Sequence, residues 1–409
     1  MQMDEDILDT VKVMLDLTQQ ERHNEDVINL LQAPLCYGGF GLQSALKKSP
    51  LAYIASLATV IEENMFSSFA GDPDALLHNS MLYWELRQCL NQVRSLLSID
   101  DDIENTLLPS SPNEFFSFFA QHHNLISHLQ HNLNSQATKL THQASLRKAQ
   151  DEDDTVTQAR LTSITSPYAS VWKDTTGTPS IPELRLADPY YRIASRMNLG
   201  LPAFVHLPDK CYSCGKDGAC ARDPYHYLSC TTHKRREITL RHNAVVHAIC
   251  TYTQLAGGFA CKEPHDMSDE DGRRPDIQIV LPNQHYLVDV VISHPLCPTH
   301  VRSAAKKPLA AAYQAEIRKD NKYHRTAQVQ HAEFVPFALE TMGGMAPKAV
   351  KLLHHILTSC RDEMTLWPHD QLMAELRSSI AVAVQRGNAM CMLSGYSRAV
   401  GRCGAAGAA

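Results

Sequence analysis

Apolar residues recur every three or four positions through most of the first 150 residues of the chain. The segments ILDTVKVMLDL, YIASLATVIEENMFSSFA, MLYWELRQCLNQVRSLL and FFSFFAQHHNLISHLQ all have this spacing. Such a pattern is typical of amphipathic helices that bury one face. Turns rich in Pro and Ser, such as LLPSSPNEFF, separate the segments. We therefore predict a helical region over residues 1–150.

A polar stretch follows over residues 151–205. It runs from DEDDTVTQARLTSITSP through several prolines to AFV, the start of AFVHLPDK. Polar, proline-containing stretches between periodic segments are typical of loops and connections. We predict a linker that is helical in part.

The pattern changes again over residues 234–345. A helical segment (about 234–256) precedes three runs that read as strands, FACKEP, RPDIQIVL and HYLVDVVIS, and a long helix (about 301–330) leads to a fourth, EFVPFALET. This αβββαβ order predicts an α+β fold with a mixed sheet and helices against it. Residues 346–409 are predicted to be helical up to GRCGAAGAA, which has too little apolar bulk to pack and is predicted to be disordered.

Composition places the chain among ordinary globular proteins. It has 409 residues, of which 44% are hydrophobic and 20% charged, enough for two or three domains. The formal net charge of −6 argues against a uniformly basic nucleic-acid protein, although residues 201–330 carry a small excess of Lys and Arg. No run of apolar residues is long enough to span a bilayer, and the start MQMDEDILDT is acidic. We expect a protein that is neither secreted nor inserted in a membrane.

Cysteine and histidine gather at residues 206–233, where a zinc knuckle is predicted. The stretch CYSCGKDGACARDPYHYLSC offers Cys211 and Cys214 as one close pair, and His226 and Cys230 as another. Two such pairs suit tetrahedral Zn²⁺, and four protein ligands leave no position for a substrate, so the ion would be structural. Cys220 and His233 are alternative ligands. The other cysteines are scattered along the chain, which argues against a disulfide framework.

Two aspartates interrupt runs that otherwise read as buried strands. Asp276 and Asp289 flank a turn at Pro282-Asn283, and antiparallel pairing across that turn would bring both carboxylates to one end of the sheet. Mg²⁺ or Mn²⁺ would relieve their repulsion, activate water and stabilise charge on a phosphate. The alternative is that each carboxylate bonds to a turn or lies at an edge. Glu263 ends the preceding strand and is either a third acid of this site or a surface residue.

These motifs together resemble one family. The order of C-x2-C, H-x3-C, RHN (Arg241, His242, Asn243), RRPD (ending in Arg274, Pro275 and Asp276) and a further acid is similar to the restriction-like endonuclease domain of non-LTR retrotransposons. The segments PLCYGGFGLQSALKKSPLAYIASLA, KYHRTAQ, FVPFALETMGGMAPKA and SSIAVAVQRGNA are also similar to such proteins. The resemblance implies a variant of the PD-(D/E)xK nuclease fold that nicks target DNA in the nucleus, with DNA and element RNA as partners.

The sequence departs from the family's pattern at two positions. Val291 stands where the motif has its basic residue, and Asp289 stands where the family more often has glutamate. The resemblance implies that a lysine from the following helix replaces the missing one; Lys319 and Lys322 are candidates, and we favour Lys322 because it adjoins Tyr323.

Further cationic and polar residues come from the same motifs. Arg241, His242, Asn243 and Arg274 could contact DNA phosphates. For the first three, a structural role that ties the zinc knuckle to the nuclease core is the alternative.

The chain lacks the paired aspartates that follow an aromatic residue in a polymerase strand, so no reverse transcriptase activity is expected. Two functions stay open: a metal-dependent DNA endonuclease without its own polymerase, or a decayed, zinc-stabilised protein that binds DNA or another partner. A third, weaker interpretation is a translated fragment without a settled function.

Overall fold

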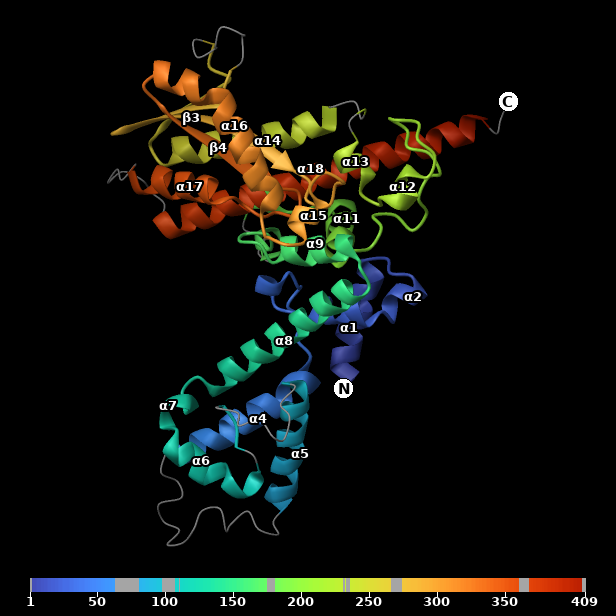
Figure 1. Ribbon diagram of the computed structural model, residues 1–409, viewed down its shortest axis with the longest axis vertical. Helices are drawn as coiled ribbons and strands as arrows, with labels where there is room; N and C mark the ends of the chain where they lie inside the picture. The colour runs from blue at the N-terminus through green and yellow to red at the C-terminus, as the bar shows by residue number, and fades with distance from the viewer. Residues whose placement is uncertain are drawn as a thin grey trace. The chain divides into compact units, whose positions relative to one another are not determined.

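The computed structural model describes residues 2–62, 81–97, 107–109, 111–174, 181–230, 232, 236–265, 274–359 and 368–406. The chain forms two compact units (Figure 1). One contains Met1–Val13 and Asn24–Lys148, and the other contains Met14–His23 and Ala149–Ala409.

The first unit is helical, as the apolar spacing predicts. Its helices are α1 (Gln2–Met14), α3 (Glu25–Gln32), α4 (Ala45–Glu62), α5 (Met81–Leu96), α6 (Phe115–Gln121), α7 (His123–Ile126) and α8 (Leu129–Asp151). Leu86 and Leu90 of α5 lie on one face of that helix, because residues four apart are neighbours. They pack in one core with Phe115 and Phe119 of α6, which are fully buried.

The second unit contains the sheet. Its strands are β1 (Phe259–Lys262), β2 (Ile277–Leu281), β3 (Gln284–Ser293) and β4 (Glu333–Glu340). They lie in the order β1-β2-β3-β4, with antiparallel pairing from β1 to β3 and parallel pairing of β3 with β4. Helix α14 (Arg236–Leu255) precedes β1, and α15 (Val301–Ala304) and α16 (Ala310–Val329) lie between β3 and β4. The α+β class and the αβββαβ order are confirmed.

The long helix predicted over 301–330 is divided in two. Pro308 lies between α15 and α16, and proline disfavours the helical conformation of the residue before it. Leu309 then adopts a φ of 60° at the N-terminus of α16. This break sets the direction of α16, which carries the lysines considered for the nuclease site.

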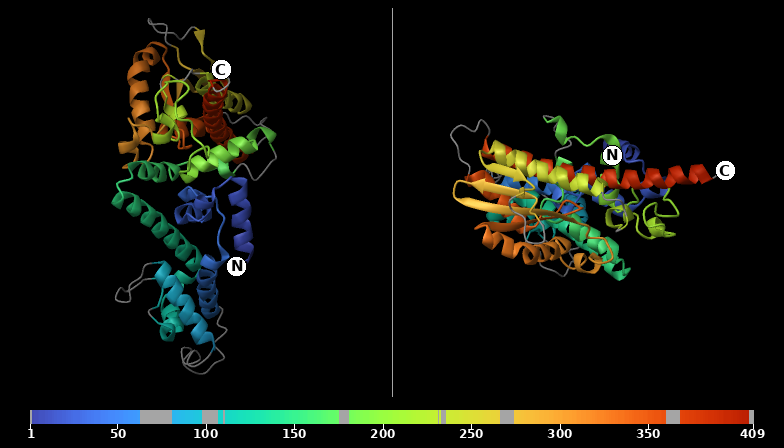
Figure 2. Two further views of the ribbon diagram at one scale, coloured as in Figure 1. Left: turned by 90° about the vertical axis from the view of Figure 1, so that its right-hand side faces the viewer. Right: turned by 90° about the horizontal axis from the view of Figure 1, so that it is seen from above.

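Alternate strand residues divide the sheet into two faces. Ile277, Val288 and Phe337 belong to a core with residues of α14, α17 (Pro347–Ser359) and α18 (His369–Ala406). The intervening residues face α16, where Ala312 packs against Ala338. Helices α14 and α18 lie side by side (Figure 2). Position in a strand therefore decides which helix a side chain meets.

The linker predicted over residues 151–205 is instead part of the second unit. It contains α9 (Thr155–Ile164), α10 (Val171–Asp174) and α11 (Asp188–Leu199), and Trp172 is 1% exposed. The segment looks like a linker because buried polar residues break its apolar pattern. Arg160, for example, is 7% exposed and donates from Nη1 to the carbonyl oxygen of Asn198 at 2.9 Å.

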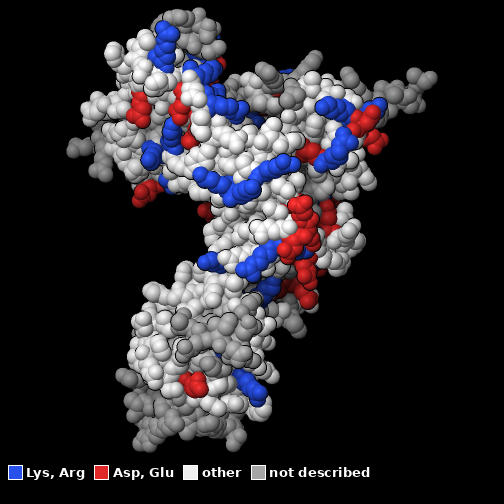
Figure 3. All heavy atoms as spheres, in the orientation of Figure 1, with Lys and Arg blue, Asp and Glu red and all other residues white. Residues whose placement is uncertain are grey.

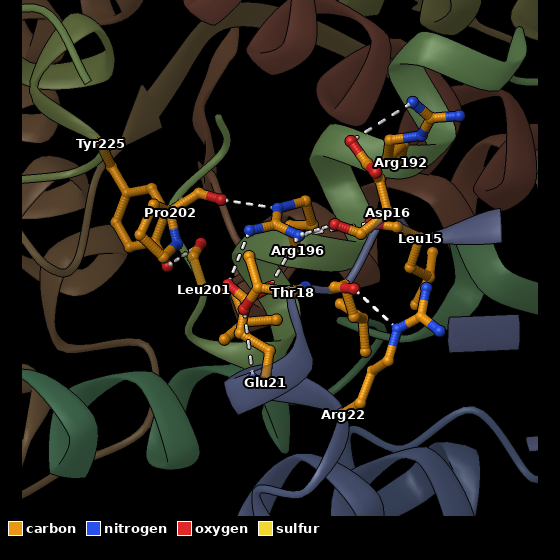
Figure 4. A network of polar contacts seen from close by, with 11 residues as sticks. Leu15, Asp16, Thr18, Glu21, Arg22, Arg192, Arg196, Leu201, Pro202 and Tyr225 are labelled. Atoms are coloured by element: carbon orange, nitrogen blue, oxygen red, sulfur yellow. Dashed lines mark hydrogen bonds and ion pairs between the residues drawn. The ribbon is translucent and has the colours of Figure 1, made fainter. Parts of the chain in front are cut away.

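A short N-terminal segment, Met14–His23, also belongs to the second unit. It contains α2 (Gln19–Arg22), which Thr18 and Glu21 cap reciprocally. Arg196 of α11 is 2% exposed and donates to the carbonyl oxygen of Asp16 at 2.9 Å and to Glu21 Oε1 at 2.8 Å (Figure 4). A buried guanidinium thus holds the segment against α11, a contact that the sequence pattern does not predict.

The remaining helices of this unit are α12 (Ala219–Arg222) and α13 (His226–Ser229). At the C-terminus, α18 continues to Ala406, into the Gly/Ala segment predicted to be disordered, and residues 407–409 lie outside the described part. Alanine is the strongest helix former, which offsets the intervening glycines. No helix in the described part of the chain is long and apolar enough to cross a membrane.

Candidate active site

The four predicted zinc ligands lie together. The ligand atoms of Cys211, Cys214, His226 and Cys230 are all within 4.8 Å of one another. Cys211 Sγ lies 3.9 Å from Cys230 Sγ, and Cys214 Sγ lies 3.4 Å from His226 Nε2. Cys211 and Cys214 lie between Lys210 and Asp217, which form a β-bridge. His226 is the first residue of α13, and Cys230 directly follows its last residue. The two close pairs predicted from the sequence therefore lie in one cluster.

This cluster could hold a metal ion such as zinc. Burial raises the pKa of the Cys211 thiol to about 12, because a thiolate loses its hydration there. A bound divalent cation would offset that loss and displace the proton. Cys220 is buried but lies outside the group, and His233 lies outside the described residues. Of the alternative ligand sets, the described residues favour the first.

The two aspartates also lie together. Asp276 directly precedes β2, and Asp289 lies in β3. Because Ile277 pairs with Val288 across the hairpin, the next position sets Asp276 opposite Asp289, on the face toward α16. Asp276 Oδ2 accepts hydrogen bonds from the backbone N–H of Val290 at 2.6 Å and from His242 Nε2 at 3.0 Å.

Their environments differ. The side chain of Asp289 is 4% exposed, against 22% for Asp276. Burial, and then the charge of Asp276, raise the pKa of Asp289. Lys319 and the hydroxyl of Tyr323 act in the opposite direction and lower it. Two carboxylates therefore lie opposite each other, and the more buried one, Asp289, is the harder of the two to ionise.

Lys319, rather than the favoured Lys322, reaches the pair. Its Nζ forms an ion pair with Asp289 Oδ2. Lys319 and Tyr323 are four positions apart, so both face the sheet, whereas Lys322 lies to one side and donates to the hydroxyl of Tyr323 at 2.8 Å. That hydroxyl donates in turn to the carbonyl oxygen of Arg274 at 2.9 Å.

Glu263 lies beside the pair without joining it. Its backbone N–H donates to the carbonyl oxygen of Asp276 at 2.9 Å, and its φ is 45°. Its side chain is exposed. Within the described part of the chain no hydrogen bond or ion pair links its carboxylate to either aspartate.

Arg241 is buried away from the surface. It is 4% exposed and donates from Nη1 to Asn388 Oδ1 of α18 at 2.7 Å. Arg241 thus ties α14 to α18. This structural role differs from the predicted one, because the contact does not involve the Cys/His cluster. Arg274 is exposed, and its Nη1 lies 2.9 Å from His265 Nδ1.

His242 has a role that the sequence did not indicate. Its Nε2 bonds to Asp276 and its Nδ1 lies 3.1 Å from Asn243 Oδ1. The hydrogen bond to Asp276 opposes the effect of burial and raises the pKa of His242 overall. The Arg-His-Asn motif marks His242 in the sequence. His242 precedes Asp276 by 34 residues, so the motif alone does not predict contact between them.

A similarity to a known protein bears on the origin of the chain. No protein-family model matches the chain. The chain is 25% identical over 191 residues to the Retrotransposable element SLACS 132 kDa protein of Trypanosoma brucei gambiense. The match covers 44% of this chain but spans only 15% of that protein's length. The similarity relates the chain to a retrotransposon protein.

Proposed function

We propose that the chain is a metal-dependent DNA endonuclease of retrotransposon origin, and that Asp276 and Asp289 form the site that nicks DNA. The observation that carries this proposal is the pair of opposed carboxylates with Lys319 beside them, built on an αβββαβ unit. Carboxylates and a lysine grouped in this way on one face of a sheet suit hydrolysis of a phosphodiester.

The residues present fit a Mg²⁺ or Mn²⁺ ion. Among the described residues, both hydrogen bonds that Asp276 accepts go to Oδ2, so Oδ1 is the oxygen that would bind a cation, which prefers carboxylate oxygens. Such an ion supplies an activated water and charge stabilisation at the phosphate. Lys319 would hold Asp289 in place and present positive charge to the scissile phosphate, while His242 fixes the orientation of Asp276.

The Cys/His cluster would hold structural Zn²⁺ in this proposal. Cys211, Cys214, His226 and Cys230 would fill a tetrahedral shell and leave no position for substrate. The partner would be chromosomal DNA in the nucleus, with element RNA as a second partner.

A plasmid-nicking assay with Mg²⁺ or Mn²⁺ tests the proposal. Asp276→Asn and Asp289→Asn should lower the nicking rate at least ~100-fold, because each removes a charge that holds the ion. Asp320→Asn is the matched control, since Asp320 is a carboxylate of the same region that pairs with Lys348 instead. Each variant is checked for zinc content and melting. Nicking retained by a folded Asp276→Asn protein would refute the assignment.

One observation favours a second function, a DNA-binding protein that has lost catalysis. Asp276 and Asp289 already have protein partners, namely His242, the Val290 N–H and Lys319. A buried cluster paired in this way could be purely structural. This alternative predicts salt-dependent DNA binding with no nicking by the folded native protein in either ion.

A further inference from the structure

We infer that one side of α16 binds the phosphate backbone of duplex DNA beside the aspartate pair. This side, the basic flank, consists of Arg318, Lys322 and Arg325. The inference deepens the proposed function and rests on it for the identity of the substrate as DNA.

The basic flank follows from helix geometry. Its members stand at positions i, i+4 and i+7 of α16, a spacing that puts them on one stripe. All three are exposed. Seven residues of helix span about 10 Å, and over that distance each strand of duplex DNA carries about three phosphates. The flank is thus as long as a short row of phosphates.

No carboxylate of α16 lies on this stripe. The helix contains two acids, Glu316 and Asp320. Glu316 is 6% exposed, and Asp320 forms an ion pair with Lys348 on the opposite side of the helix. Among the residues of α16, this stripe therefore carries basic side chains and no carboxylate. Over the part of the surface where Figure 1 draws α15 and α16, Figure 3 shows Lys and Arg side chains with some Asp and Glu side chains among them.

The basic flank is continuous with the candidate active site. Lys322 contacts the hydroxyl of Tyr323, and Tyr323 affects the pKa of Asp289, which it lowers. Lys319, one residue from Arg318, pairs with Asp289 itself. A backbone that lies along the flank would therefore bring a neighbouring phosphate to the carboxylates. This placement favours a linear polyanion over an acidic peptide, because the charges must continue into the site.

Fluorescence anisotropy with a labelled DNA duplex tests the inference. The full chain carries Asp276→Asn so that cleavage cannot interfere, and divalent ions are omitted. Arg318 and Arg325 are both changed to Ala; Lys322 is retained because it contacts Tyr323. Lys351→Ala is the matched control, since Lys351 is an exposed cation on α17, which packs on the other face of the sheet.

The double variant should bind DNA on the order of 10-fold more weakly, whatever the sequence of the duplex. The slope of log Kd against log salt, measured between about 50 and 200 mM, should become shallower by about 2. Lys351→Ala should match the parent. Arg318→Lys with Arg325→Lys should restore much of the binding, because lysine supplies the same charge.

Equal binding by the parent and the double variant would overturn the inference, as would stronger binding to duplex RNA than to DNA. The proposed function is tested separately. If the native chain nicks DNA and the double variant binds DNA as tightly as the parent, the inference is overturned and the proposed function is kept. Weakened binding without native nicking would retain the basic flank and support the non-catalytic alternative.

Discussion

Glu340, the last residue of β4, is a buried carboxyl outside the candidate active site. It is 0% exposed, and its Oε1 accepts from the backbone N–H groups of Ala311 at 3.1 Å and Ala312 at 3.4 Å. Burial raises its pKa from 4.5 to about 7. The folded chain therefore holds this proton more tightly than the unfolded chain, so its contribution to the free energy of unfolding should fall as the pH rises from 4.5 to about 7.

Glu340→Gln should remove this pH dependence while it keeps an acceptor for the two N–H groups. Relative to the native protein, the variant should gain about 3 kcal/mol between about pH 4.5 and pH 8. Urea unfolding of both proteins at the two pH values measures the difference, in which the titration of histidines common to both cancels. Parallel loss of stability in the two proteins would show that Glu340 does not titrate in this range.

Single residues differ in how far the sequence reveals them. A charged residue stands out in a strand whose other residues are apolar. The two-residue turn fixes the register of the hairpin, so the sequence predicts that Asp276 lies opposite Asp289. The positions of Lys319 and His242 could not be predicted, because their distance to the aspartates depends on how α16 and α14 pack on the sheet. Lys322 adjoins Tyr323 in the sequence. Lys319, four residues before Tyr323, shares its helix face and therefore faces the strand.

At the scale of elements, the Cys/His cluster supports the segment that contains α12 and α13. These helices are only four residues each, too short to be stable without tertiary support. If the cluster holds Zn²⁺ as proposed, Cys214→Ser should lower the zinc content of the protein and speed amide hydrogen exchange through residues 209–230, because metal binding is coupled to local folding.

Cys220→Ser is the control for that experiment, since Cys220 is a cysteine of the same segment whose thiol lies outside the cluster. Elemental analysis of the purified proteins gives the zinc content, and hydrogen exchange with mass spectrometry gives the local order. Loss of zinc in Cys220→Ser, with retention in Cys214→Ser, would reverse the ligand assignment.

The sheet was predictable because its strands are mostly apolar runs of four to ten residues, which turns and helical segments separate. The segment over 151–205 was not, because arginines inside it are buried and satisfied by carbonyl oxygens, which reads in the sequence as a polar connection. The division at Pro308 carried a signal, since proline restricts the residue before it, but the strength of the flanking helical pattern concealed it.

At the scale of the whole molecule, the Met14–His23 segment also departs from the predicted order of domains. Its neighbours on both sides in the chain belong to the first unit, while the segment itself belongs to the second. Leu15 and Leu17 are 1% and 4% exposed, so it contributes apolar burial as well as the Arg196 contacts. A local apolar pattern of this length indicates a helix but does not indicate which unit the helix joins.

Arg196→Ala should therefore destabilise the second unit. The change leaves Glu21 and the carbonyl oxygens of Leu15, Asp16 and Pro202 without their buried donor, which typically costs about 3 kcal/mol or more. Hydrogen exchange resolves the two units separately, so the test reads protection in α11 and around Trp172, with α5 as the internal reference from the first unit.

Arg192→Ala is the matched control on the same helix. Arg192 is 44% exposed at its side chain and lies 4.0 Å from Asp16, and an exposed pair of this kind is worth about 1 kcal/mol or less. Exchange in α11 should be little changed in this control and markedly faster in Arg196→Ala. Arg192 makes only an exposed ion pair with Asp16 and an exposed hydrogen bond to the carbonyl oxygen of Met14, whereas the contacts of Arg196 are made by a buried guanidinium. Equal protection of α11 in both variants would mean that Leu15 and Leu17 suffice to hold the segment and that the guanidinium is dispensable.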